Sequence, residues 1–580
     1  MDAPRLDGGR MSQSSLGPSA TASAAAPQYK AAAVSTHEAS ESATTPASGF
    51  RTFVGRGAYL AAPGGHMDED EPPPNDVPSV FEQTSAEIFR LQKALDVPPR
   101  VVRDVLLESY WRHCHPWMPV VNNQAKFRAT LDCPSSPLLL QAMLMAGSRM
   151  ASIPITYASS AELYARAKTL FWLDSEKDPV VCLIAACTLQ WWTPHGPESF
   201  SLDTAYSWLR LAVSIAFQIG LHQDGKAPVN ASLQRRIWWS LVARDCCISV
   251  AHGRPRAIKL YDSDVPMPCE SDFRASGLAM PARFVSYVKI CLILGDIAER
   301  HHPPKAFPSD NRLELETKLR AWIQALPPEL KIYEEPLPRR LMPYNFETRQ
   351  LHVAYLAALV IANHPSNIND PPSRVAILAS SLIAGLFDEF LIRDDVRFLG
   401  PVFTFYLLAA SLTQLRCCQY TSLRATAEFN LRIIERAQVE LEKKWPSATG
   451  SQRLYSKVRD RIFGQATSAA AILSLPDRPI TPAQRLLFQD YGDELCNQWH
   501  LFPQDRVTEG ENLAIGIHDS VGEFARASET DDLSTILDDS LGLIANPGHH
   551  LYGMNSDLGQ DREITGGDIG SWLLWDDVLV

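Results

Sequence analysis

Apolar residues recur at helical spacing through the whole middle of this 580-residue chain, and that pattern constrains the fold most strongly. In residues 205–220, Trp208, Leu211 and Ile215 fall on one face of a helix, and Gly220 follows as the residue that ends it. No stretch alternates with the period of two that a half-buried strand requires. The pattern therefore predicts an all-α fold.

Periodic stretches between residues 78 and 500 predict one helix after another. A second long helix, 233–252, follows Ser232, whose hydroxyl suits the N-cap. Because no segment repeats at a fixed period, we expect a large irregular multi-helix domain rather than a solenoid. The other predicted helices cover residues 83–95, 99–114, 137–151, 160–174, 178–192, 282–302, 311–325, 345–363, 373–392, 398–420, 423–444 and 452–473.

Composition divides the chain into three parts. Of the first fifty residues, 29 are Ala, Ser, Thr or Pro, and very few are large aliphatic residues. Such a segment cannot bury enough apolar surface to offset the chain entropy lost on folding. We expect residues 1–76 to be disordered, with an interruption near Phe53, and residues 77–505 to form the helical body. Residues 506–580 are richer in Gly, Asp and Ser and form a tail.

The net charge of −12 belongs almost entirely to that tail. Residues 519–580 hold 13 acidic and 2 basic side chains, so the rest of the chain is close to neutral. A neutral body argues against a surface built to bind nucleic-acid phosphates over its whole extent.

Cysteine content and hydropathy point to an intracellular protein without a membrane anchor. The 11 cysteines are far too few for a disulfide scaffold. The N-terminus lacks an apolar signal core, and no apolar run reaches the roughly 18 residues that a membrane helix needs. Residues 138–147 and 403–412 are the most apolar runs and are shorter. We therefore expect no membrane partner.

Motifs that carry catalysis are missing from the sequence. It contains no GxxxxGK[ST], GxSxG or HExxH pattern, and Asp394-Asp395 lacks the further acid that a diphosphate-ionising helical enzyme would use to hold magnesium. We expect no enzymatic activity, no catalytic residues and no cofactor.

His113, Cys114 and His115 stand together as potential metal ligands. On a helix, adjacent side chains diverge by about 100°, so three consecutive residues cannot converge on one ion. Packing roles are therefore expected for them, and no metal site is predicted.

One stretch resembles a known family closely. Residues 234–268, QRRIWWSLVARDCCISVAHGRPRAIKLYDSDVPMP, resemble the signature helix and loop of the fungal-specific transcription factor domain, the middle homology region of fungal zinc binuclear cluster regulators. Residues 208–224 (WLRLAVSIAFQIGLHQD) and 110–121 (YWRHCHPWMPVV) are similar to other parts of that domain, and the similarity spans residues 53–445. FVG at 53–55 and the DSDVP loop resemble the cutinase transcription factor-like branch.

Within the signature helix, physical chemistry predicts structural roles. The side chains of Trp238 and Trp239 are large enough to anchor a core. We expect an Asp245–Arg254 ion pair to tie the helix to its loop, with ligand binding by the arginines as the alternative. The family-motif residues, predicted to be mainly structural, are His115, Pro116, Arg236, Trp239, Asp245, Gly253, Arg254 and Pro255.

Family members that bind DNA do so through an N-terminal cluster of six cysteines that holds two zinc ions. In this sequence no cysteine precedes Cys114, and the first 76 residues contain five Lys or Arg. The expectation is that the zinc cluster is lacking, that no DNA-binding residue is identifiable, and that contact with DNA is indirect, through a zinc-cluster partner.

The acidic tail interleaves its charges with large apolar residues, which is typical of activation domains. The charges keep such a segment solvated while aromatic and Leu side chains stay available to a partner's groove. A packed segment covering the helical body is the alternative. The candidate activation residues are Trp572, Leu573, Leu574, Trp575, Asp576 and Asp577.

Together these features predict a nuclear regulator of transcription for a pathway-specific gene set, with a fungal secondary-metabolite cluster as a candidate. Its tail would contact the transcription machinery or co-activators. The alternative is a ligand-sensing or partner-sequestering co-regulator that does not bind DNA itself.

Overall fold

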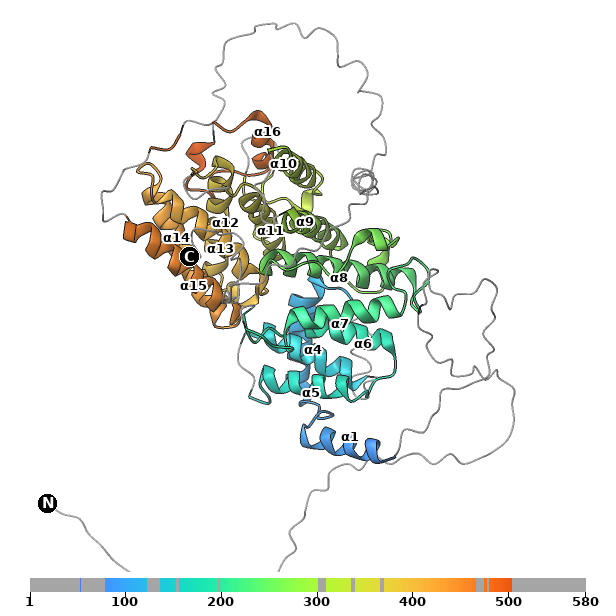
Figure 1. Cartoon of the computed structure of the whole chain (residues 1–580). Helices are drawn as coiled ribbons and strands as arrows, with labels where there is room; N and C mark the ends of the chain where they lie inside the picture. The colour runs from blue at the N-terminus through green and yellow to red at the C-terminus, as the bar shows by residue number, and fades with distance from the viewer. Residues whose placement is uncertain are drawn as a thin grey trace, which may run out of the picture. The chain divides into compact units, whose positions relative to one another are not determined.

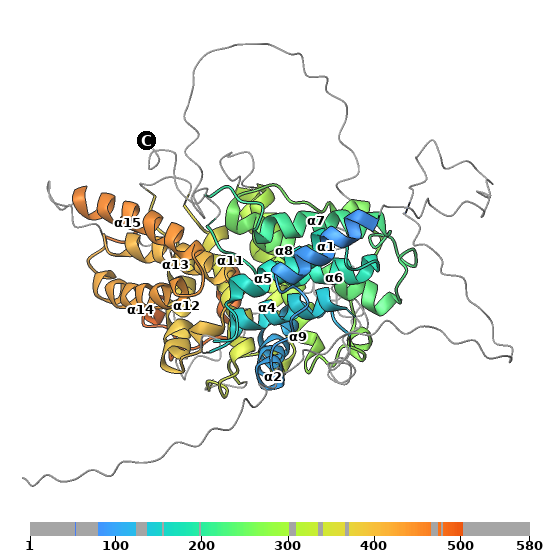
Figure 2. The same ribbon diagram turned by 90° about the horizontal axis from the view of Figure 1, so that it is seen from below.

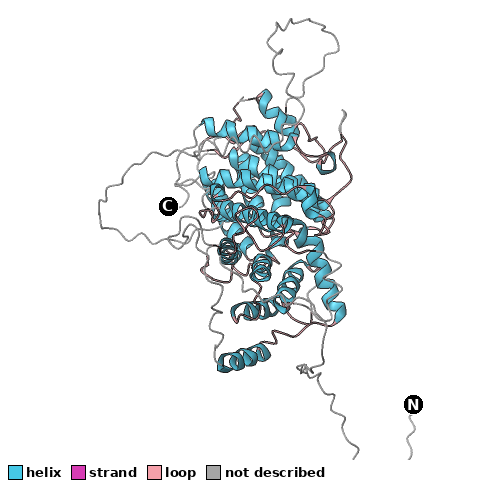
Figure 3. Cartoon of the chain, turned by 90° about the vertical axis from the view of Figure 1, so that its right-hand side faces the viewer, coloured by secondary structure: helices cyan, strands magenta, loops and turns pink. Residues whose placement is uncertain are grey.

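A computed structural model describes residue 53 and residues 79–122, 136–152, 156–196, 199–300, 309–334, 340–365, 370–465, 474–476 and 479–502. The predicted all-α fold is confirmed. The described residues form helices and loops, with an isolated bridge between Tyr333 and Leu341 (Figure 3). The helices are α1 (Ser79–Leu91), α2 (Arg100–Ser109), α4 (Pro137–Met150), α5 (Ser160–Trp172), α6 (Pro179–Leu189), α7 (Ala205–Gln218), α8 (Ala231–His252), α9 (Pro281–Arg300), α10 (Ser309–Gln324), α11 (Phe346–Ala362), α12 (Arg374–Ile392), α13 (Val402–Cys417), α14 (Arg424–Glu442), α15 (Ser447–Gln465) and α16 (Pro482–Arg485).

Short polar side chains begin many of these helices. Ser159 and Glu162 form a capping box at the start of α5, each side chain accepting the other residue's backbone N–H. For α8 the predicted N-cap Ser232 is wrong. Asn230 caps the helix by accepting the N–H of Leu233 at 2.8 Å, so α8 begins earlier than the apolar pattern indicated.

The first helices pack around α4. Helices α2, α5 and α6 contact it, α7 packs on α6, and α8 follows α7. Between α2 and α4 the chain widens into a π-helical turn, η1 (Tyr110–Cys114), and then tightens into a 3₁₀ turn, η2 (His115–Trp117). Figure 1 shows these segments in blue and green, with α8 beside α7.

The later helices pack around α13. Helix α9 lies along α8 and also contacts α10 and α11, and α11 packs on α12. Helix α13 contacts α12, α14 and α15, and it also reaches α8. Figure 2 shows α12 to α15 together, in yellow and orange. Helices α8 and α9 therefore join the early helices to the late ones through one continuous core.

Helix α12 is long and apolar enough to cross a membrane by length and composition alone, contrary to the sequence expectation that no run qualifies. Its side chains instead pack against α11, α13 and α14, and most of them are fully buried. Since a helix covered on all sides must be apolar all round, burial in the core explains this composition.

Phe53, where we expected an interruption of the N-terminal segment, contacts the end of α7. Its N–H donates to the carbonyl of Gln218 at 2.7 Å, and its ring meets that of His222 edge-on. Gly220, with φ of +72°, leaves room for that ring. The rest of residues 1–76, and the whole tail from residue 506, lie outside the described residues, so their predicted disorder remains a prediction.

We predict that Gly147→Ala destabilises the protein by about 2 kcal/mol. Alanine normally favours a helix interior over glycine by about 1 kcal/mol. At this position a Cβ would lie 1.9 Å from the backbone oxygen of Leu106, so α4 and α2 would have to separate. Urea unfolding followed by helical circular dichroism measures the change. Thr317→Ala, at an exposed position in α10, is the control that should cost little; a stabilised Gly147→Ala protein would contradict the close contact.

Candidate functional site

The signature helix α8 is buried along nearly its whole length, so its polar side chains need partners within the protein. Arg236 donates hydrogen bonds to the carbonyl of Pro119 and the side-chain oxygen of Asn122. Burial lowers the pKa of this guanidinium to about 10. On the same helix, Trp239 Nε1 donates to the carbonyl of Pro266 at 2.8 Å. These bonds fix the segment after η2 and the DSDVP loop to α8.

Asp245 ties α8 to the loop that follows it, but the expected partner Arg254 is wrong. The carboxylate accepts the N–H groups of Ala257 and Ile258 at 2.8–3.0 Å and lies 3.6 Å from Arg256 Nε. The guanidinium of Arg254 instead lies 4.7 Å from the ring centre of Tyr206. The carboxylate of Asp245 therefore binds the backbone that follows Pro255 rather than the side chain of Arg254, which precedes it.

The loop leaves α8 at a residue suited to a sharp turn. Gly253 ends the helix with φ of +59°, a left-handed conformation that favours glycine. Ser249 then donates to the carbonyl of Arg254 at 2.6 Å, and Arg210 of α7 donates to the carbonyl of Pro255 at 2.7 Å. The carbonyls of Arg254 and Pro255 thus accept hydrogen bonds from side chains of α8 and α7.

His113, Cys114 and His115 point to separate partners. The His113 ring stacks on Phe398 at 4.3 Å, the Cys114 thiol donates to the carbonyl of Ala146, and His115 packs at 4.5 Å from Trp111. Burial lowers the pKa of His113 to about 4 and that of His115 to about 3. Pro116 is buried beside them in η2. In the described part of the chain, no group of three potential ligands surrounds a metal position.

Arg244, the residue before Asp245 on α8, faces a cavity instead of an acid. Its Nε donates to Gln190 Oε1 and its Nη2 to the Gln190 carbonyl, both at 3.3 Å, and its guanidinium lies 5.8 Å from the ring centre of Trp191. No ion pair joins it to a carboxylate of the described residues. The side chain is only 8% exposed.

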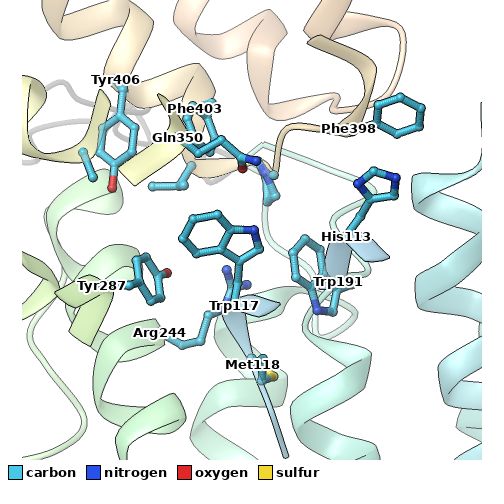
Figure 4. Close-up of a pocket in the computed structure, with 14 residues that line it drawn as sticks. His113, Trp117, Met118, Trp191, Arg244, Tyr287, Gln350, Phe398, Phe403 and Tyr406 are labelled. Carbon is cyan, nitrogen blue, oxygen red and sulfur yellow. The ribbon is translucent and has the colours of Figure 1, made fainter. Parts of the chain in front are cut away.

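The cavity beside Arg244 has a volume of about 40 Å³, enough for a few water molecules. Figure 4 shows the indole of Trp117 between Tyr287 and Trp191, with Arg244 reaching toward it. The other described residues that line it come from η1, the residue after η2, α11, residues 398–401 and α13: His113, Met118, Gln350, Ala354, Phe398, Gly400, Pro401, Val402, Phe403 and Tyr406.

A larger hollow of about 360 Å³ also borders Arg244. It shares Arg244, Pro401 and Val402 with the small cavity and is also lined by residues 199–202 and 204–207, the second half of α8 and the start of α15. Among its described lining residues are His195, His252 and Arg254, but no Asp or Glu. The two spaces form the candidate functional site.

A pair of thiols lies behind the hollow. Cys247 Sγ is 3.4 Å from Cys291 Sγ on α9 and 3.7 Å from the hydroxyl of Tyr287. The hydrogen bond with Cys291, together with the charge of Arg244, lowers the pKa of Cys247, whereas burial raises the pKa of Cys291. Arg244 thus contributes to the lowered pKa of Cys247.

In the sequence, Arg244 stands directly before the motif residue Asp245, and nothing there places it beside a cavity. Gln190 and Trp191 follow a helix that the periodicity predicted, yet nothing in their spacing signals contact with a residue 54 positions later. The candidate activation residues, Trp572 to Asp577, lie outside the described residues.

Comparison with known proteins identifies a domain within the chain. Residues 107–324 match the fungal-specific transcription factor domain. They include the π turn, α8 with its loop, and most of the residues around Arg244. No solved structure matches the chain.

Several curated proteins are similar over a longer stretch. Cutinase transcription factor 1 alpha of Fusarium vanettenii is 28% identical over 403 residues, which cover 63% of this chain and 44% of that protein. The acetamidase regulatory protein of Aspergillus fumigatus is 27% identical over 404 residues, covering 65% and 51%. Cutinase transcription factor 1 beta of Fusarium vanettenii is 30% identical over 222 residues, covering 35% and 25%. The matched part of this chain thus spans about half the length of the first two relatives.

We predict that Asp245→Asn lowers the free energy of unfolding by about 2–4 kcal/mol. An amide would leave one of the loop N–H groups or Arg256 without its acceptor inside the core. Urea unfolding measures the loss, and the exposed Asp224→Asn serves as the matched control. A loss of less than about 0.5 kcal/mol would show that the carboxylate does not hold the loop.

A second prediction concerns pH. Because the pKa of His113 is lowered to about 4 in the fold, an unfolded chain binds more protons between about pH 6.5 and 4, so stability falls on acidification through that window. The His113→Phe protein keeps an aromatic ring stacked on Phe398. Between pH 7 and 5 its free energy of unfolding should fall by about 1–2 kcal/mol less than that of the original protein. The exposed His500→Phe should lose as much as the original protein. Equal pH dependence in all three proteins would refute the assignment.

Proposed function

Residues 107–324 form a fungal-specific transcription factor domain, and from that premise we propose that the chain regulates transcription of a pathway-specific gene set in the nucleus. The match to this domain carries the proposal. The names of its relatives, cutinase transcription factor and acetamidase regulatory protein, support the same role. A secondary-metabolite cluster is the candidate gene set. Regulation of this kind requires no catalytic activity.

The tail is the segment that we propose contacts the transcription machinery or co-activators. Residues 519–580 carry nearly all of the chain's net charge, and large apolar residues stand between the acids. A solvated segment that displays Trp and Leu side chains suits an apolar groove on a partner protein. For the helical body we propose a DNA-binding zinc-cluster regulator as partner, so that this chain's own contact with DNA is indirect.

A second candidate function is ligand sensing, which the hollow beside Arg244 favours. A regulator that sequesters a related factor in response to a small molecule would use the same body without the tail. Since the hollow meets α8, α13 and α15, an occupant would contact helices from both ends of the domain.

The tail's role can be tested with the full chain fused to a heterologous DNA-binding domain. We expect reporter transcription to fall at least about fivefold when Trp572→Ala is combined with Trp575→Ala, since removing two large apolar anchors costs on the order of 1 kcal/mol or more. The matched variant, with both residues changed to Phe, keeps aromatic anchors and should retain most of the output.

Equal reporter output from the original, Ala and Phe proteins would remove the tail from the proposal. No activation by the original fusion would instead favour the sequestering regulator, which is then tested by capture of a zinc-cluster partner.

A further inference from the structure

Arg244 is a buried cation without a counter-ion among the described residues. Two of its guanidinium nitrogens are engaged by Gln190, a neutral side chain, and the residue lines both the cavity and the hollow. Burying an arginine without a negative partner is costly. Among other buried arginines, Arg256 lies near Asp245 and Arg349 lies 2.8 Å from Glu389, whereas Arg236 binds a carbonyl and Asn122 and lines neither space. Arg244 is therefore arranged to receive an anion.

Polar atoms around the hollow also lack partners. Ser447 Oγ, Thr193 Oγ1 and His252 Nδ1 are buried and form no hydrogen bond in the structure, and all three residues line the hollow. Ser447 is the first residue of the 19-residue helix α15, and the helix dipole favours negative charge at that end. Burial lowers the pKa of His252 to about 3, so its ring is neutral and can serve as donor without adding charge.

The rest of the wall is mainly apolar. Phe200 and Leu202 are 95% and 75% exposed and stand at its outer side, while Tyr206, Ile248 and Val402 line it further in. Exposed large apolar side chains beside a hollow are typical of sites that cover the apolar part of a ligand. The described lining residues thus combine one accessible positive region with an apolar surface.

We propose that this hollow binds a small organic anion, with a carboxylate or phosphate monoester head at Arg244 and an apolar body along Phe200, Leu202 and Tyr206. Ser447 and Thr193 donate hydrogen bonds to the head or to the water that accompanies it. The inference deepens the ligand-sensing part of the proposed function, and binding itself needs neither DNA nor the tail.

The site's position explains how occupancy would be transmitted. Arg244 belongs to α8, Ser447 begins α15 and Val402 begins α13, so an occupant of the hollow would lie against three helices. Because a ligand shifts a conformational equilibrium only through contacts that differ between states, a site shared by several helices is suited to that purpose.

The test uses the purified full chain and isothermal titration with three probes of equal chain length: octanoate, octyl phosphate and the neutral octanamide. We expect at least one of the two anions to bind, at least about tenfold more tightly than octanamide, because a charged hydrogen bond is worth about 1.5–3 kcal/mol. The better anion identifies the head group. Equal affinity for all three probes, or no binding of either anion, would overturn the proposal and leave a water-filled hollow.

Variants test the geometry. Arg244→Gln should weaken binding of the preferred anion about tenfold or more, whereas Arg166→Gln, a buried arginine on α5, should not.

If the Arg244→Gln protein fails to fold, two variants of the exposed Phe200 test the site instead. Phe200→Glu and Phe200→Lys lose the same apolar contact but place opposite charges at the hollow, so the Glu protein should bind the anion several times more weakly than the Lys protein. Equal binding by these two proteins would overturn the site. Reporter activation is measured separately, so failure of binding and failure of the regulatory role are distinguishable.

Discussion

Polar side chains on a helix surrounded by core must find their partners inside the protein, and much of this domain is arranged around that requirement on α8. Arg236 binds the segment after η2, Trp239 binds the DSDVP loop, and Asp245 binds the backbone beyond Pro255. Each bond fixes a segment distant in sequence against the same helix. An apolar α8 of equal size would fill the core but would leave these loops without a defined position.

Helix placement was largely predictable because it depends on local periodicity. Helix α7 and its terminating Gly220 follow directly from the spacing of apolar residues, and α12 was placed within one residue of its observed start. The start of α8 was misjudged because Ser232 and Asn230 are both good N-caps, and only the backbone shows which accepts the N–H of Leu233. The apolar length of α12 was also underestimated.

The candidate site was less predictable because its contacts join distant parts of the chain. A choice between Arg254 and Arg256 as the partner of Asp245 depends on the path of the loop, which composition does not specify. The position of Gln190 beside Arg244 depends on how α6 packs. That Arg244 is buried with no carboxylate of the described residues beside it can be recognised only once the positions of the neighbouring side chains are known.

The composition of α12 has a consequence for synthesis on the ribosome. Of the helices that cover it, α11 precedes it in the chain, but α13 and α14 are made afterwards. For the time needed to translate about fifty more residues, a segment that could pass for a membrane span has only part of its cover. During that interval it presents apolar surface to chaperones and to membrane-targeting factors alike, so the pace of elongation through α13 and α14 bears on how much of the chain reaches its folded state.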